Sequence, residues 1–153
     1  MKTITMIFLF LVLLFPLSAK AQSAIPPTTD QPVTEEEVRR FMDEYKARMM
    51  RMDIDAFMDL FSKEAVENRM IFYDDIRRAY GKAFASSNAI EDRLEIYSVQ
   101  AYQKSALVRG RYDLVQSLKG KRRRVSYQGD IQWNLIRENG SLKIKEINYG
   151  RDQ

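Results

Sequence analysis

The repeat of hydrophobic residues changes once along this chain, and that change most constrains its fold. Before Ser86-Ser87-Asn88, apolar residues recur at helical spacing, as at Val38, Met42 and Tyr45. After it, β-branched and aromatic residues follow a period close to two, which is typical of strands with one buried face. A chain with its helices first and its strands afterwards is expected to fold as an α+β domain.

Three helices are expected before this change, each with a polar residue placed to cap it. Thr34 and Glu37 form a capping box, in which the Thr34 hydroxyl accepts from the Glu37 N–H and the Glu37 carboxylate reaches back to Thr34. Asp53 is placed to cap a short second helix, and Asp74 or Asp75 to cap a third.

Four strands are expected after the change, and their connections indicate an antiparallel meander. Asn139-Gly140 in the last connection is a strong hairpin signal. Because consecutive strands then lie side by side, the helices must cover one face of a curved, cone-like sheet. Trp133 and Phe41 should be buried in the core. The expected strands are Leu94–Tyr102, Ala106–Leu118, Val125–Ile136 and Leu142–Tyr149.

The N-terminus has the three parts of a secretory signal peptide. Lys2 is followed by an apolar run from Ile4 to Leu17 and by the small-residue cleavage site Ala19-Lys20-Ala21. The run is shorter than the roughly 18 to 20 residues that span a bilayer, so we expect cleavage near Ala21/Gln22 and a periplasmic or secreted protein. The expected organisation is a signal peptide at 1–21, an extended, proline-containing linker at 22–33 and one domain at 34–153.

Composition excludes several kinds of chemistry. The chain has no cysteine and no histidine, which removes disulfides, the usual zinc ligand sets and histidine-based nucleophile systems. We expect neither a metal ion nor a cofactor, so chemistry would rely on carboxylates, tyrosines or lysines. Of the formal net charge of +4, Lys2 and Lys20 belong to the signal, so no nucleic-acid partner is expected.

Several segments together resemble the nuclear transport factor 2-like superfamily, particularly its SnoaL-like and ketosteroid-isomerase-like branches. They are FMDLF, YDDIRRAYGKAF, SVQAYQKSALVRGRY and GDIQWNLIRENGSLKIKEINYG, and the similarity covers about residues 34 to 150. The resemblance implies a pocket between sheet and helices and, in many members, a homodimer through the sheet. In catalytic members a pocket acid acts with a tyrosine on the first helix, a place that Tyr45 would take. The segment SKEAVENRMIFYDD has no clear counterpart of the usual loop acid.

Aromatic residues are the candidate lining of such a pocket, for a small apolar or aromatic ligand. The alternative is that they pack in the core and in exposed cross-strand pairs. Asp113 and Asp130 also fall on strands, but their alternation with arginines and glutamines predicts a solvated outer face. The candidate pocket residues are Tyr45, Tyr80, Tyr97, Tyr112, Tyr127 and Trp133.

Five cations surround one hairpin turn and could bind an anionic component of the cell envelope. The alternative is a solubilising hairpin tip, because neither an aromatic stacking residue nor a glycine-rich phosphate cradle accompanies the cluster. The cations are Lys119, Lys121, Arg122, Arg123 and Arg124.

Taken together, these features predict an exported, non-catalytic ligand-binding or accessory domain of the cell envelope. One alternative is a small cofactor-free isomerase, dehydratase or hydrolase that uses a carboxylate and Tyr45. Another is a protein-interaction subunit of an envelope assembly. No residue is assigned a catalytic role from the sequence.

Overall fold

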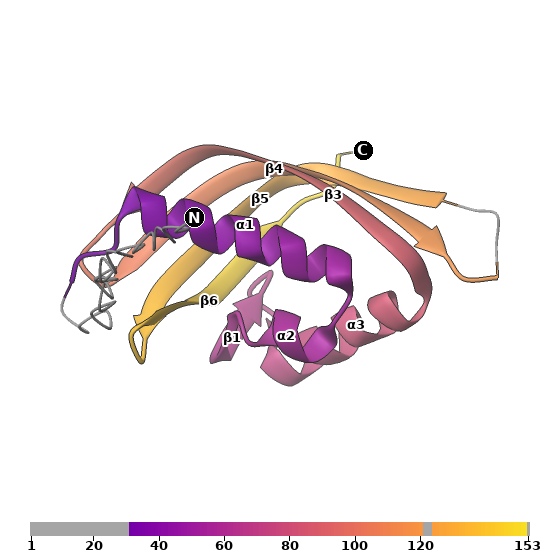
Figure 1. Cartoon of the computed structure of the whole chain (residues 1–153), viewed down its shortest axis with the longest axis horizontal. Coiled ribbons are helices and arrows are strands. Elements are labelled where there is room, and N and C mark those ends of the chain that lie inside the picture. Colours follow the sequence, from indigo (N-terminus) through magenta and orange to yellow (C-terminus); the bar gives the residue numbers. More distant parts are fainter. Residues whose placement is uncertain (1–30, 121–123, 153) are drawn as a thin grey trace, which may run out of the picture.

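The computed structural model describes residues 31–120 and 124–152. It confirms the α+β class, with helices and a strongly curved sheet (Figure 1). The expected signal peptide and most of the expected linker lie outside the described residues. In chain order the elements are α1 (Glu35–Arg51), α2 (Ile54–Met58), β1 (Phe61–Glu67), β2 (Ile71–Phe72), α3 (Tyr73–Ala85), β3 (Ser87–Ala101), β4 (Ser105–Leu118), β5 (Arg124–Glu138) and β6 (Ser141–Tyr149).

The sheet is mixed, with the strand order β2-β1-β6-β5-β4-β3. The predicted meander from β3 to β6 is confirmed, and Asn139 and Gly140 adopt the positive φ angles of 50° and 80° that its last turn needs. The sheet as a whole differs from a simple antiparallel meander in one respect, because β1 adds to it in parallel with β6. β1 enters the sheet from the helical layer, so no tight hairpin with β6 sets its direction.

β1 and β2 were not predicted from the sequence, and the start of α3 was misplaced. Asn68 and Arg69 have φ angles of 48° and 63° and turn the chain between the two strands. α3 begins at Tyr73 without a side-chain cap, whereas Asp74 and Asp75 lie inside its first turn. At that position the two carboxylates interact favourably with the positive end of the helix dipole but do not cap the helix.

The capping of the other two helices follows the sequence more closely. Thr34 Oγ1 accepts from Glu37 N at 3.2 Å, and Asp53 Oδ1 accepts from two N–H groups of α2. The second half of the capping box is wrong, because the Glu37 carboxylate instead accepts two hydrogen bonds from Arg137 on β5, at 2.8 and 2.7 Å. A long-range contact thus replaces the local one.

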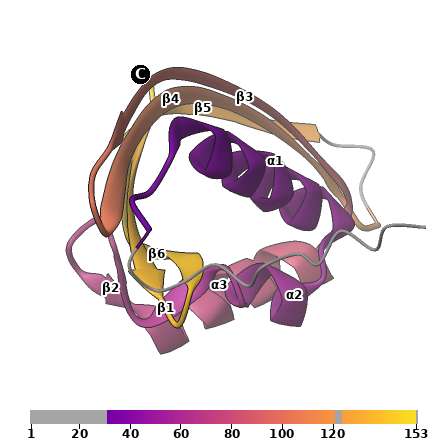
Figure 2. The same ribbon diagram turned by 60° about the vertical axis from the view of Figure 1, so that its left-hand side comes forward.

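The sheet curves around α1, and α2 and α3 lie below that helix (Figure 2). The core between these layers includes Trp133, Phe57 and Ile76, all fully buried. Phe41, expected to be buried, is only partly so, because it lies at the edge of the α1 stripe. Val33 was assigned to the linker but is buried, and its N–H donates to Tyr102 O at 3.2 Å, so the domain begins before Thr34.

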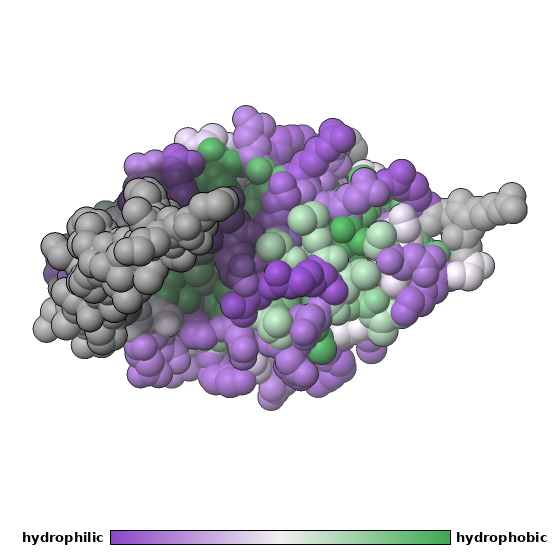
Figure 3. All heavy atoms as spheres, viewed as in Figure 1, coloured by the Kyte–Doolittle hydropathy of each residue, from purple (hydrophilic) through white to green (hydrophobic). Residues whose placement is uncertain are grey.

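The face of the molecule seen in Figure 3 mixes hydrophilic and hydrophobic areas. On the face in Figure 3, hydrophilic residues form the border, and hydrophobic ones gather over the end of α1 and over α2 and α3. None of the helices in the described residues is long and apolar enough to cross a membrane.

Candidate functional site

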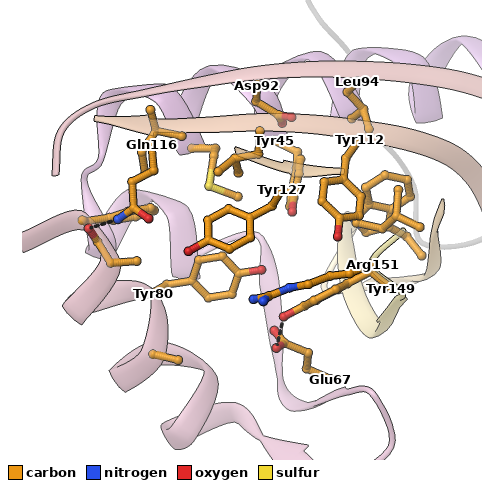
Figure 4. A pocket seen from close by; sticks show the side chains of 18 residues that line it. Tyr45, Glu67, Tyr80, Asp92, Leu94, Tyr112, Gln116, Tyr127, Tyr149 and Arg151 are labelled. Carbon is orange, nitrogen blue, oxygen red and sulfur yellow. Dashed lines mark hydrogen bonds between the residues drawn. The ribbon is translucent and has the colours of Figure 1, made fainter. Parts of the chain in front are cut away.

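A cavity of about 320 Å³ lies between the concave face of the sheet, α1 and α3. Its walls are mainly aromatic and aliphatic, as in most small-molecule sites, with a few polar groups that converge on the interior (Figure 4). Every strand except β2 contributes to it. The lining residues are Tyr45, Met49, Glu67, Ala79, Tyr80, Ala83, Phe84, Ile90, Asp92, Leu94, Tyr112, Leu114, Gln116, Tyr127, Ile131, Trp133, Tyr149 and Arg151.

Asp92 is a buried acid in this cavity; the residue lies on β3 and is 6% exposed. Burial raises the pKa of its carboxyl to about 6, against the opposing effect of the Lys46 charge and with some help from Asp113. Its Oδ1 atom is buried without a hydrogen-bond partner among the described residues. A carboxyl with this pKa can take up and release a proton near neutral pH.

Glu67 is a second buried acid, at the end of β1 and 3% exposed. Its Oε1 atom accepts a hydrogen bond of 2.5 Å from the Tyr149 hydroxyl, and its Oε2 atom is unpartnered within the described part of the chain. Burial raises the pKa of the carboxyl more than the Tyr149 hydrogen bond lowers it. The cavity therefore contains two acids with different partners.

Tyr45 of α1 and Tyr80 of α3 lie deep in the same cavity, where their hydroxyls stay protonated. The pKa of Tyr45 is raised far above its usual range, first by burial and then by the Asp92 charge. The pKa of Tyr80 is also raised, again chiefly by burial. The two hydroxyls also form a hydrogen bond with each other, in which Tyr80 donates to Tyr45. The protonated Tyr45 hydroxyl can therefore donate a hydrogen bond to a bound molecule at any physiological pH.

Gln116 of β4 supplies a fixed amide. Its Nε2 atom donates to Ser87 Oγ at 2.8 Å and to Ala83 O at 3.3 Å, and the Ser87 hydroxyl in turn donates to Ala83 O at 2.6 Å. These contacts set the orientation of the amide, because the Ala83 carbonyl can only accept. The Gln116 Oε1 atom remains as an acceptor on the cavity wall.

Three solved structures share this architecture at low sequence identity. A candidate aromatic ring hydroxylase from Novosphingobium aromaticivorans has a TM-score of 0.67 and 20% identity over 77% of this chain and 88% of that chain. A candidate scytalone dehydratase from the same organism has a TM-score of 0.66 and 13% identity over 77% and 83%. A candidate dehydratase of the NTF2-like family from Streptomyces avermitilis has a TM-score of 0.66 and 14% identity over 77% and 95%.

The chain has the nuclear transport factor 2-like fold. The expectation that the resemblance gave for the architecture is confirmed. No protein-family model and no curated protein matches the chain. At these identities the likeness concerns the fold, so the chemistry has to be argued from the cavity itself.

Five of the six candidate pocket residues line the cavity of this nuclear transport factor 2-like domain; Tyr97 does not. Tyr97 is 59% exposed, because it follows Ile96 on β3 and so lies on the opposite face of the strand from Leu94 and Ile96, toward solvent. Whether the other five contact a ligand stays a prediction. Asp130, expected on the outer face, is exposed, and Asp113 is half-buried.

The basic turn is only partly described. Lys119 is exposed, and Arg124 pairs with Glu91 of β3 at 2.7 Å. Lys121, Arg122 and Arg123 lie outside the described residues. Binding of an anionic envelope component at this turn therefore stays a prediction.

The sequence left both cavity acids out of the candidate site. Asp92 lies two residues before Leu94, where the first strand was predicted to begin; in fact β3 starts at Ser87. Extending the strand back would have placed Asp92 on the same face as Ile90 and Leu94. Glu67 alternates with buried Ala65 in the same way, but its segment was not predicted to be a strand.

No group of three or more metal-binding side chains occurs in residues 31–120 and 124–152.

Proposed function

We propose that the chain binds a small, largely apolar ring compound with a carbonyl or hydroxyl group in this cavity and transfers a proton on it. The single observation that carries the proposal is the Asp92 carboxyl, which is buried, has an unpartnered oxygen and has its pKa raised to about 6. Such a group can act as a general base near neutral pH.

The neighbouring groups support the same chemistry. Asp92 would remove a proton from a carbon next to a carbonyl, and the Tyr45 hydroxyl would donate a hydrogen bond to the oxygen on which negative charge develops. The two groups are close enough for the Asp92 charge to raise the pKa of Tyr45. In an isomerase the proton on Asp92 returns to another carbon of the ligand; in a dehydratase it passes to the ligand hydroxyl that leaves as water. This is the chemistry of a cofactor-free isomerase or dehydratase.

The test uses 2-tetralone, a bicyclic ketone with exchangeable protons beside its carbonyl. In D₂O, the protein should accelerate the exchange of these protons by about a hundredfold or more over buffer, as is usual for a positioned base. Asp92→Asn should remove the acceleration while the ketone still binds. Asp130→Asn, an exposed change of the same kind, should leave the rate unaltered. Binding without any acceleration would overturn the catalytic proposal.

A non-catalytic role as an exported ligand-binding or accessory domain is the second candidate. The absence of histidine and cysteine from the whole chain favours it, because these are the commonest bases and nucleophiles. In both cases we propose that the protein acts outside the cytoplasm, on the basis of its signal-like N-terminus. The exposed Tyr97 on the sheet would be available to the homodimer that the resemblance implies.

A further inference from the structure

The segment after β6 is held against β5 by main-chain contacts. Gly150 N donates to Asp130 O at 3.1 Å, and Asp152 N donates to Gln128 O at 3.0 Å. Gly129 permits this close approach, because a Cβ atom there would lie 2.2 Å from the Gly150 carbonyl oxygen. The backbone on both sides of residue 151 is therefore fixed.

Side chains hold the same segment from β4. The Tyr112 hydroxyl donates to Gly150 O at 2.7 Å, and Arg111 forms an ion pair with Asp152. Gly150 and Asp152 are thus anchored on either side of Arg151. The Arg151 side chain extends over the cavity, with its guanidinium carbon 4.5 Å from the centre of the Tyr127 ring (Figure 4). This cation–π contact holds the guanidinium beside the Tyr127 ring.

Arg151 has no carboxylate partner within the described part of the chain. It is exposed and also lines the cavity, so it lies at the open side. The two acids of the cavity, Asp92 and Glu67, are buried inside it. An anionic group of a ligand would be repelled by the interior and attracted to the opening.

We propose that Arg151 binds an anionic group of the ligand, so that the ligand is a flat, mostly apolar ring compound carrying one small oxyanion such as a carboxylate. The inference rests on the proposed function for the cavity, and it adds the charge of the ligand and its orientation. The anionic group would face Arg151 at the opening, and the ring would extend among the tyrosines. A guanidinium suits this role because its planar N–H groups match an oxyanion.

The test compares two probes of nearly equal shape, 2-naphthoate and its neutral amide 2-naphthamide, by isothermal titration calorimetry on the purified protein. The parent protein should bind the naphthoate more tightly. Arg151→Gln should weaken naphthoate binding by about tenfold, as expected for a charge-assisted contact, and change naphthamide binding by less than about twofold. Arg109→Gln is the matched control, because Arg109 is an exposed arginine on β4 that does not line the cavity.

The possible failures are distinguishable. If Arg151→Gln weakens both probes equally, or neither, the inference about Arg151 is wrong while binding in the cavity stands. If the parent binds the two probes equally well, the preference for an anion is wrong. If the parent binds neither probe, this inference is overturned, and the 2-tetralone exchange decides separately on the proposed cavity function. Unfolding midpoints of both variants that match the parent exclude misfolding as the cause.

Discussion

The ionised Asp92 carboxylate should destabilise the folded protein, because the burial that raises its pKa also disfavours its charge. Its pKa is about 6 in the fold against an ordinary value of 3.8, so the folded state binds the proton more tightly than the unfolded chain. The free energy of unfolding therefore falls as pH rises from about 4 to about 6, and the full loss of stability is present above that range. A buried acid maintained at this cost is common at functional sites.

Replacing Asp92 by Asn tests this directly. The neutral amide should raise the free energy of unfolding at neutral pH by up to about 3 kcal/mol and reduce its decline between about pH 4 and pH 6. The raised pKa of Glu67 should leave part of the decline in place. Urea unfolding at several pH values measures both effects. An unchanged pH dependence would show that Asp92 titrates normally.

The same residue shows why the site was harder to predict than the fold. Alternation along a strand identifies an inward acid only if the start of the strand is known, and Ser87-Asn88 resembles a turn although it begins β3. Gln116 illustrates a different limit. Its role depends on Ser87, which the pairing of β3 with β4 brings to it, and on Ala83, which the packing of α3 on the sheet brings to it.

At the scale of elements, the contact between Glu37 and Arg137 joins the start of α1 to the β5–β6 hairpin. The Arg137 side chain is 4% exposed and the Glu37 side chain 26%. Removing one partner of such a pair leaves the other charge buried without compensation. Glu35, in the same helical turn, also pairs with an arginine, but both side chains of that pair are more than half exposed.

Two substitutions therefore form a matched pair. Glu37→Gln should lower the free energy of unfolding by about 2 kcal/mol, because it weakens charge-assisted hydrogen bonds to a buried guanidinium. Glu35→Gln should cost no more than about 0.5 kcal/mol. Urea midpoints of the two variants give the comparison. Equal losses would mean that the contact between α1 and β5 is no more than a surface ion pair.

Sequence periodicity captured the elements that carry a strong hydrophobic pattern and missed those that do not. β3 to β6 are long and alternate, so the meander and its turns could be predicted. β1 contains Lys63 and Glu64 in a short segment, and β2 has only two residues. Both are stabilised as strands by their neighbours in the sheet, which local sequence does not reveal.

For the whole molecule, the order of helices and strands predicted the class, and the resemblance predicted the cone. The cavity could not be derived in this way. Its volume depends on how far the curved sheet stands from α1 and α3, and it remains open because tyrosines line it without filling it. Curvature and spacing of this kind arise from the twist and registers of all the strands together.

The proposed export concerns the molecule as a whole, because the compartment determines which ligands reach the cavity. The small side chains of Ala19 and Ala21 fit a signal-peptide cleavage site, so protein recovered outside the cytoplasm should have the intact mass of residues 22–153. Replacing both alanines by Arg should block cleavage and retain the precursor mass. If the unaltered chain also retains residues 1–21, cleavage at this site is wrong. If the protein stays in the cytoplasm, its ligand must be sought there, and the proposed contact of the basic turn with an anionic envelope component loses its basis.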